Sequence, residues 1–206
     1  VSIVRSHGYS SMCVSAGSLG AGGLLAHWAL VAILSFARNF QSVPVSIIGI
    51  TFSTAAFPIM AKAIATHSQE EFKKTLKNSF WLILGGSTLA AIVIFIIREP
   101  LVRIVLGGGA FSEEAILRTA TMLGAFTLAM PTESLRHLLA RAFYATKNTV
   151  TPVVLSIVGL IIAIGGGYLL RPSLDILAIP IAFSAASLVE LIFLIVLLPH
   201  RLKKLA

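Results

Sequence analysis

The sequence predicts an all-α fold, a polytopic bundle of membrane-spanning helices. Hydrophobic residues make up 57% of the 206 residues and charged residues only 12%, about half the charged fraction of a typical soluble domain. The mean hydropathy is +0.95. Apolar residues gather into continuous runs near the roughly 20 residues that a helix needs to cross a bilayer, without the alternation of barrel strands. These observations indicate an integral membrane protein.

Six apolar runs approach the length of a membrane span. They cover residues 19–37, 43–61, 80–97, 115–144, 150–170 and 176–198. Polar or glycine-containing stretches separate them and are expected to be the connections, at 67–77, 98–100, 107–109, 147–148, 171–172 and 201–204. Residues 1–18 are small and mixed, begin without methionine and lack a signal-peptide pattern. We expect a truncated or divergent N-terminal segment over 1–18 and a transmembrane bundle over 19–206.

The first two runs allow two topologies, because only residues 38–42 separate them. They form either a tight hairpin of two spans or one long helix kinked near Pro44, since proline removes a backbone hydrogen bond and crowds the preceding turn. A hairpin would place the start of the chain inside the cell, and a single bent span would place it outside. Periodicity leaves both arrangements open.

Basic residues divide unevenly between alternate connections. One side collects Lys62, Lys73, Lys74, Lys77, Arg141, Lys147, Arg201, Lys203 and Lys204, and the other has Arg98, Arg103, Arg118 and Arg171. Cytoplasmic loops carry the excess of lysine and arginine, so the first side, with the C-terminal end of the chain, is predicted to be cytoplasmic. The net charge of +8 then reflects the topology. The sequence contains no basic soluble module of the kind that binds nucleic acid.

The sequence offers little support for catalysis, a metal or a cofactor. Cys13 is the only cysteine, and the five histidines never take the spacing of a helical metal-binding pair. The glycines at 107–109 lack the ending of a phosphate-binding loop. The apolar runs hold too few acids and bases for a nucleophilic triad. We therefore expect a protein that is not an enzyme.

Polar residues within the fourth run are the first candidates for transport chemistry, because a charge at the bilayer centre is costly. Glu133 precedes Arg136 by three residues and His137 by four, so one helical face carries all three. Pro131 is expected to bend the helix just upstream. The cluster is either a cavity-lining ion pair that contacts a charged substrate or a structural pair within the bundle, with Arg141 reaching the cytoplasmic interface.

Arg38 is the second candidate, followed by Gln41 after three residues. In a single bent helix Arg38 would lie at membrane depth and face a wet cavity, whereas in a hairpin it would be an ordinary loop arginine. Glu190 follows alanines at 178, 182 and 186, a stripe that suits close helix packing. It is expected to meet a polar group of a neighbouring helix or the interface. The glycines at 159 and 165–167 are also expected to allow close packing.

Three sequence blocks occur in a distinctive order. They are Asn39-Phe40-Gln41-Ser42-Val43-Pro44 through Gly49 to Phe57-Pro58, then Gly108-Gly109-Ala110-Phe111 before Glu113-Glu114, then Arg141-Ala142-Phe143-Tyr144-Ala145 followed by Asn148-Thr149 and Thr151-Pro152. This arrangement resembles the MurJ/MviN lipid II flippases of the multidrug/oligosaccharidyl-lipid/polysaccharide exporter superfamily. The resemblance spans roughly residues 30 to 204.

The resemblance implies one bent span for the first two runs, and five spans matching helices eight to twelve, within the second of two lobes. It implies flipping of an undecaprenyl-pyrophosphate-linked peptidoglycan precursor across the bacterial cytoplasmic membrane by alternating access, with membrane lipids and the missing first lobe as partners and no cofactor. Many members have arginine five residues before the proline, where this chain has Asn39; Arg38 lies one step earlier, about 100° around the helix. The region of Glu133, Arg136 and His137 matches a helix that borders the central cavity.

Two alternatives remain at this point. A related exporter of polysaccharide lipids or drugs would be favoured if the other lobe lacked a cationic cluster. A membrane scaffold that does not transport would be favoured if these 206 residues were the whole natural protein.

Overall fold

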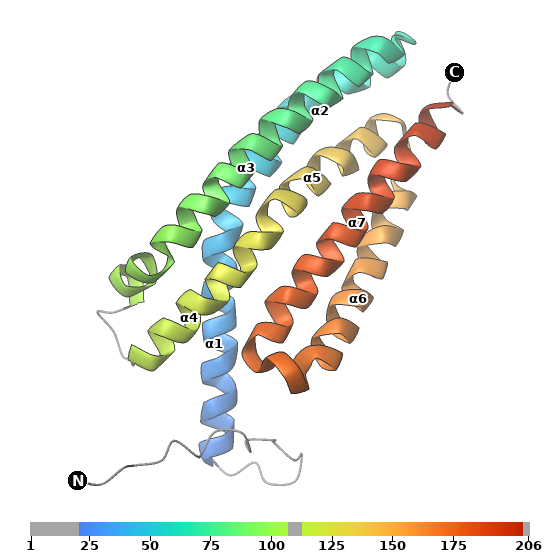
Figure 1. The fold of residues 1–206 in the computed structure, drawn as a ribbon. Coiled ribbons are helices and arrows are strands. Elements are labelled where there is room, and N and C mark those ends of the chain that lie inside the picture. The colour runs from blue at the N-terminus through green and yellow to red at the C-terminus, as the bar shows by residue number, and fades with distance from the viewer. Residues whose placement is uncertain (1–20, 107–112, 204–206) are drawn as a thin grey trace, which may run out of the picture.

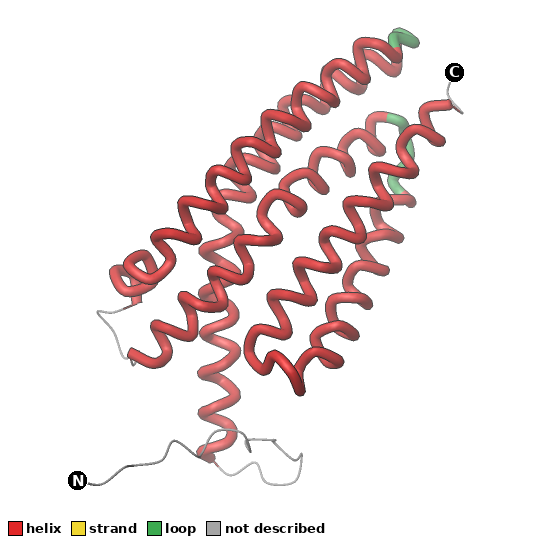
Figure 2. The backbone as a smooth tube through the Cα atoms, in the orientation of Figure 1, coloured by secondary structure: helices red, strands yellow, loops and turns green. Residues whose placement is uncertain are grey.

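The chain folds into a bundle of long helices that run side by side (Figure 1). The structure is a computed structural model that describes residues 21–106 and 113–203, so the predicted segment 1–18 and the block 108–111 lie outside the described residues. The elements in chain order are α1 (Ala21–Pro44), η1 (Val45–Ile50), α2 (Thr51–Ala65), α3 (Gln69–Leu106), α4 (Glu113–Phe126), η2 (Thr127–Ala129), α5 (Met130–Ala145), α6 (Val150–Leu174), η3 (Asp175–Leu177) and α7 (Ala178–Lys203). Figure 2 shows helix almost throughout this part, with turns at 66–68 and 146–149. The predicted all-α membrane bundle is confirmed.

The first two apolar runs form one continuous helical span. The backbone stays helical from α1 through Pro44, widens into the π-helical segment η1, and continues as α2. The widening begins directly after Pro44, which lacks an N–H and so interrupts the regular backbone hydrogen bonds of the helix. Gly49 of η1 lies against α5, where an added Cβ would come within 2.8 Å of the Ser134 Cα atom. The bent single helix is therefore correct, and the hairpin alternative is wrong.

Helix α3 is much longer than the apolar run that predicts it. It covers 38 residues, about 57 Å of helix. The connection expected at 67–77 is helical from Gln69 onward, and the one expected at 98–100 is helical throughout. Glu70 and Glu71 lie in its first turn, where acidic groups favour the positive end of the helix dipole. The polar stretch 171–172 is likewise inside α6. Polar residues end the hydrophobic span without ending the helix.

The fourth apolar run is broken near its middle, as Pro131 predicts. A 3-10 segment, η2, separates α4 from α5, and Pro131 lies at the start of α5. The hydroxyl of Thr127 donates to the Gly124 carbonyl over 2.7 Å, and that of Thr132 donates to the Ala129 carbonyl over 2.9 Å. These hydroxyls thus bond backbone carbonyls on either side of the irregular segment.

Helices α6 and α7 pack closely through small residues, as the sequence predicts. Ala178, Ala182 and Ala186 are buried, and a Cβ on Gly166 would lie 3.2 Å from that of Ala182. Gly159 faces α7 in the same way, whereas a Cβ on Gly165 or Gly167 would meet nothing within 4 Å. Only two of the four glycines thus account for the close approach.

Two buried apolar clusters hold the remaining helices together. The larger one joins α2, α3, α5 and α7 and includes Met60, Phe72, Ile83, Leu138, Phe143 and Leu194. The second joins α1, α3 and α4 and includes Ile33, Ala37, Val102, Leu123 and Phe126. Polar side chains also join α1 to α5 and α5 to α7.

Candidate functional site

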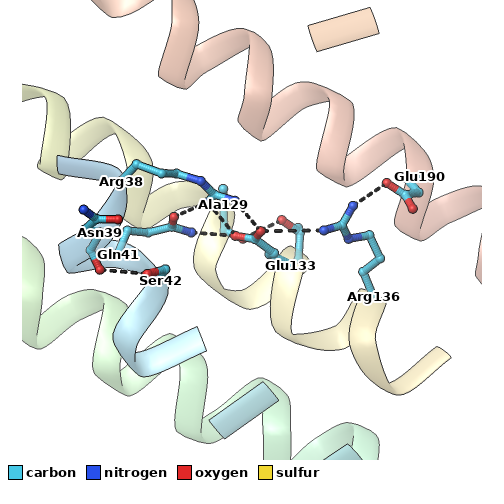
Figure 3. A network of polar contacts seen from close by, with 9 residues as sticks. Arg38, Asn39, Gln41, Ser42, Ala129, Glu133, Arg136 and Glu190 are labelled. Atoms are coloured by element: carbon cyan, nitrogen blue, oxygen red, sulfur yellow. Dashed lines mark hydrogen bonds and ion pairs between the residues drawn. The ribbon is translucent and has the colours of Figure 1, made fainter. Parts of the chain in front are cut away.

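A buried carboxylate on α5 binds two side chains of α1. Arg38 Nη1 and Nη2 donate to Glu133 Oε2 and Oε1 over 3.0 and 2.8 Å, a bidentate geometry that favours strong pairing. Gln41 Nε2 donates to Glu133 Oε2 over 2.8 Å, and Arg38 also donates to the Gln41 amide oxygen. Figure 3 shows Arg38 and Gln41 pointing from α1 toward Glu133. Spacing of three along α1 places both donors on one helical face.

The contacts continue from α5 to α7 and α6. Arg136 Nη2 lies 3.6 Å from Glu133 Oε1, so the predicted ion pair is present, and Arg136 Nη1 donates to Glu190 Oε2 over 2.8 Å. The hydroxyl of Ser156 on α6 donates to Glu190 Oε1 over 2.8 Å. We call Arg38, Gln41, Glu133, Arg136, Glu190 and Ser156 the polar network. It connects α1 with the three consecutive helices α5, α6 and α7.

The polar network is neutral in formal charge but exposes mainly its cations. The side chains of Glu133 and Glu190 are 5% and 3% exposed, whereas those of Arg38 and Arg136 are 36% and 24% exposed. Each carboxylate is fully engaged by donors, which offsets the cost of burying its charge. The part of the network that a ligand can reach therefore consists of guanidinium groups.

A cavity of about 270 Å³ adjoins the polar network. Its lining combines polar and small apolar side chains from α5, α6 and α7: Arg136, Ser156, Gly159, Leu160, Ala163, Phe183, Ala186, Ser187 and Glu190. Phe183 also carries the Arg38 guanidinium 4.3 Å above its ring centroid, a distance at which a cation is attracted by an aromatic face. The cavity and both arginines thus belong to one site.

The structure brings together four of the five side chains predicted for the substrate cavity. Arg38, Gln41, Glu133 and Arg136 are in direct contact. His137 is half-buried on the next position of α5, and among the described residues no hydrogen bond or ion pair is recorded for it. The roles of all five in transport stay predictions.

Two further expectations about arginines can be compared with the structure. Asn39 occupies the position at which many members of the family that the sequence resembles have arginine. It is exposed, whereas Arg38 points toward α5 (Figure 3). Arg141 donates from Nε to the Ser53 hydroxyl over 3.2 Å, so it ties α5 to α2.

The sequence did not identify Glu190 as a member of the polar network, whose α7 end it forms. It predicted only that this carboxylate would meet a neighbouring polar group, and the partner is Arg136, which lies 54 residues away in the chain. No local pattern indicates this contact, and in the folded chain Gly159 provides the space for it, since a Cβ there would lie 3.0 Å from Glu190 Oε2. A glycine facing a membrane carboxylate indicates that space is reserved for the charged group. The described ranges contain no group of three metal-ligating side chains.

The family is decided by comparison with known sequences. The sequence model described as lipid II flippase MurJ matches residues 26–206.

The chain belongs to the MurJ family.

Among similar proteins is the probable lipid II flippase MurJ of Rickettsia prowazekii, 31% identical over 157 residues, which are 76% of this chain and 31% of that protein. The probable lipid II flippase MurJ of Bdellovibrio bacteriovorus is 24% identical over 168 residues, or 82% of this chain and 32% of that protein. The chain thus spans about a third of the length of these curated relatives.

A solved structure has the same fold. It is a lipid II flippase MurJ in an inward closed conformation, with a TM-score of 0.74 and 19% sequence identity over 85% of this chain and 38% of that one. The match shows that the described bundle shares its fold with part of that structure. MurJ membership identifies a family of membrane transporters.

Proposed function

We propose that this chain forms part of the second lobe of a transporter that flips a lipid-linked peptidoglycan precursor. The cargo is an undecaprenyl-pyrophosphate-linked disaccharide-pentapeptide, which moves between the leaflets of the bacterial cytoplasmic membrane by alternating access. The first lobe of the same protein is the partner that completes the pathway. Membership of the MurJ family supports this function.

The observation that carries the proposal is the exposure of cations within the polar network. A pyrophosphate needs donors in a planar fork, and the guanidinium of arginine provides this geometry. Arg38 and Arg136 are partly accessible, while their carboxylate partners are buried behind them. A phosphate oxygen can therefore reach the guanidinium groups without first meeting a carboxylate.

Cargo binding at this site would act on helix packing as well as on affinity. Arg38 joins α1 to α5, and Arg136 joins α5 to α7. A pyrophosphate that takes donors from either arginine weakens the bond to Glu133 or Glu190 and so loosens two helix contacts. The irregular segments η1 and η2 lie close to this point in the chain. We propose that cargo binding biases the angle between these helices.

The charge distribution supports one orientation. The α2–α3 turn, the α5–α6 turn and the end of α7 lie at one end of the bundle (Figure 1). This end carries exposed lysines, which are Lys62, Lys73, Lys74, Lys77 and Lys147. Because cytoplasmic segments hold the excess of basic residues, we propose that this end, and the C-terminal end of the chain, face the cytoplasm.

A depletion experiment tests the transport function. Cells depleted of their own flippase receive the full-length natural gene that contains this chain, and growth and cell shape are measured. We expect rescue by the full-length protein and none by the 206-residue segment alone. Failure of the full-length protein, when it is present in the membrane, would contradict lipid II flipping.

A substitution tests the site. Arg136→Ala in the full-length protein is expected to lower the appearance of lipid II at the outer surface more than it lowers the amount of protein in the membrane. The matched control is Arg103→Ala, since Arg103 is exposed near the opposite end of the bundle. If Arg136→Ala lowers lipid II transport and the amount of protein in the membrane equally, Arg136 has only a structural role.

A further inference from the structure

Arg98 of α3 differs from Arg103 and Arg118, which lie at the same end of the bundle. Arg103 lies 2.9 Å from a carboxylate oxygen of Glu113, and Arg118 lies 2.7 Å from one of Glu114. Among the described side chains, Arg98 has no ion pair or hydrogen bond of this kind. Its recorded contact is with Phe95, whose ring centroid lies 4.2 Å from the guanidinium carbon. The charge of Arg98 is therefore not balanced by an acid of the described chain.

A shallow cavity receives the Arg98 side chain. Its volume is about 270 Å³, and its lining comes from α3, α4, η2 and η3: Phe95, Arg98, Thr121, Gly124, Ala125, Leu128 and Leu177. Gly124 leaves the space for the arginine, because an added Cβ would lie 3.0 Å from both the Cδ and the Nη1 atom of Arg98. The Thr121 hydroxyl already donates to the Leu117 carbonyl. The guanidinium is thus the free donor of this cavity.

The position of Arg98 along α3 corresponds to a membrane boundary. Seventeen residues separate it from Trp81, about 26 Å of helix, and Lys77 lies one turn beyond Trp81. The hydrocarbon core is about 30 Å thick, and exposed tryptophan is typical of its edge. With Trp81 and Lys77 at one edge, Arg98 lies at the other, at the depth of lipid headgroups.

The surroundings of Arg98 combine one cation with apolar surface. Phe95 and Leu128 line the cavity and are 48% and 67% exposed. A guanidinium binds phosphate oxygens bidentately, and the exposed apolar side chains offer a surface for acyl chains. This pairing of a headgroup donor with a chain-binding surface matches the chemistry of a phospholipid.

We propose that the Arg98 cavity is a binding site for the phosphate of an anionic glycerophospholipid. The site lies in the leaflet opposite the lysine-rich end of the bundle. It is separate from the polar network and does not depend on the proposed function. A phospholipid bound here would bridge α3 and α4 beside the 3-10 segment η2.

Native mass spectrometry of the full-length protein tests this site. The protein is freed of lipid in detergent and titrated with phosphatidylglycerol, and the population with one bound lipid is measured. Arg98→Gln is expected to weaken that binding about tenfold or more, because it removes a charge-assisted contact. Gly124→Leu, which fills the cavity, should have the same effect. Arg103→Gln is the matched control and should bind as the wild type does.

Two further arms identify the ligand chemistry. Phosphatidylcholine, whose choline offsets the phosphate charge, is expected to bind more weakly than phosphatidylglycerol to the wild type and to be less affected by Arg98→Gln. Inorganic phosphate should not displace the bound lipid, since it lacks chains that contact Phe95 and Leu128. Gel filtration of each variant confirms its folding, and Arg98→Gln alone is decisive if Gly124→Leu does not fold.

Three results would overturn the proposal. One is equal phosphatidylglycerol binding by folded Arg98→Gln and Arg103→Gln proteins. The second is equal affinity of the wild type for the two phospholipids. The third is displacement of the lipid by inorganic phosphate, which would assign the cavity to a free anion instead.

Discussion

Replacing Glu133 with glutamine keeps the shape of the side chain and removes its charge. Glu133 accepts three hydrogen bonds, two from Arg38 and one from Gln41, at 2.8 to 3.0 Å. Interhelical hydrogen bonds within membranes contribute about 0.6 kcal/mol on average and up to about 1.7 kcal/mol. A glutamine oxygen can still accept one of the three, so we expect the free energy of unfolding to fall by about 1 to 3 kcal/mol.

The coupling between Arg38 and Glu133 is measured by a double-mutant cycle. The variants are Arg38→Gln, Glu133→Gln and the two together, each in the full-length protein, unfolded by sodium dodecyl sulfate in mixed micelles and followed by circular dichroism. The second substitution removes a charge that the first has left unpaired. The free energy of unfolding of the double variant should therefore fall by at least about 1 kcal/mol less than the sum of the decreases in the two single variants.

The exposed pair of Arg103 and Glu99 is the control for this cycle. Their side chains are 48% and 54% exposed and 3.5 Å apart, so their coupling should stay below about 0.5 kcal/mol. The decreases in the free energy of unfolding for Arg38→Gln and Glu133→Gln could instead be additive to within about 0.5 kcal/mol. That result would refute the view that this pair holds α1 on α5.

Three further predictions test the packing and the orientation of the bundle. Gly49→Ala should destabilise the protein by about 1 to 3 kcal/mol in the same unfolding assay, because its Cβ would overlap the α5 backbone. The control Gly85→Ala should not destabilise the protein, because the space around Gly85 is open. Gly159→Ala should displace the α7 carboxylate that lies 3.0 Å from its new Cβ and lower lipid II flipping, while Gly165→Ala on the same helix should leave flipping unchanged. In a full-length protein whose Cys13 and any other cysteines are replaced by serine, a cysteine introduced at Ser68, in the turn after α2, should react with a membrane-impermeant maleimide only after the cells are opened. Labelling of this variant in intact cells would reverse the proposed orientation.

The spans could be predicted from the sequence where hydrophobicity alone determines them. Helix α6 encloses the apolar run 150–170, and α7 covers the run 176–198 except for its first two residues, which belong to η3. A buried or lipid-facing helix leaves such a continuous apolar signal. The ends of α3 could not be predicted in this way. Its polar first turns and the stretch around Pro100 remain helical, since backbone hydrogen bonds continue beyond the apolar core.

The joining of the first two runs depended on information that a local pattern does not contain. Residues 38–42 have the polarity of a loop, but Arg38 and Gln41 are satisfied within the bundle by Glu133, which lies 95 and 92 residues further along the chain. Resemblance to a known family favoured the bent helix, and periodicity did not. Spacing along α5 predicted the local pair of Glu133 and Arg136. It could not identify Glu190 as the closer partner of Arg136, because that contact depends on how α7 packs.

In the proposed function the arginines of the polar network act on the cargo, and a charge-neutral pair of substitutions separates this role from helix packing. Arg136→Gln and Glu190→Gln are combined in the full-length protein, so that neither side chain leaves an unpaired charge. Stability in micelles and the accessibility of lipid II at the outer surface of flippase-depleted cells are both measured. We predict near-normal stability with flipping lost as fully as in Arg136→Gln alone. Wild-type flipping by the double variant would contradict a direct role for Arg136.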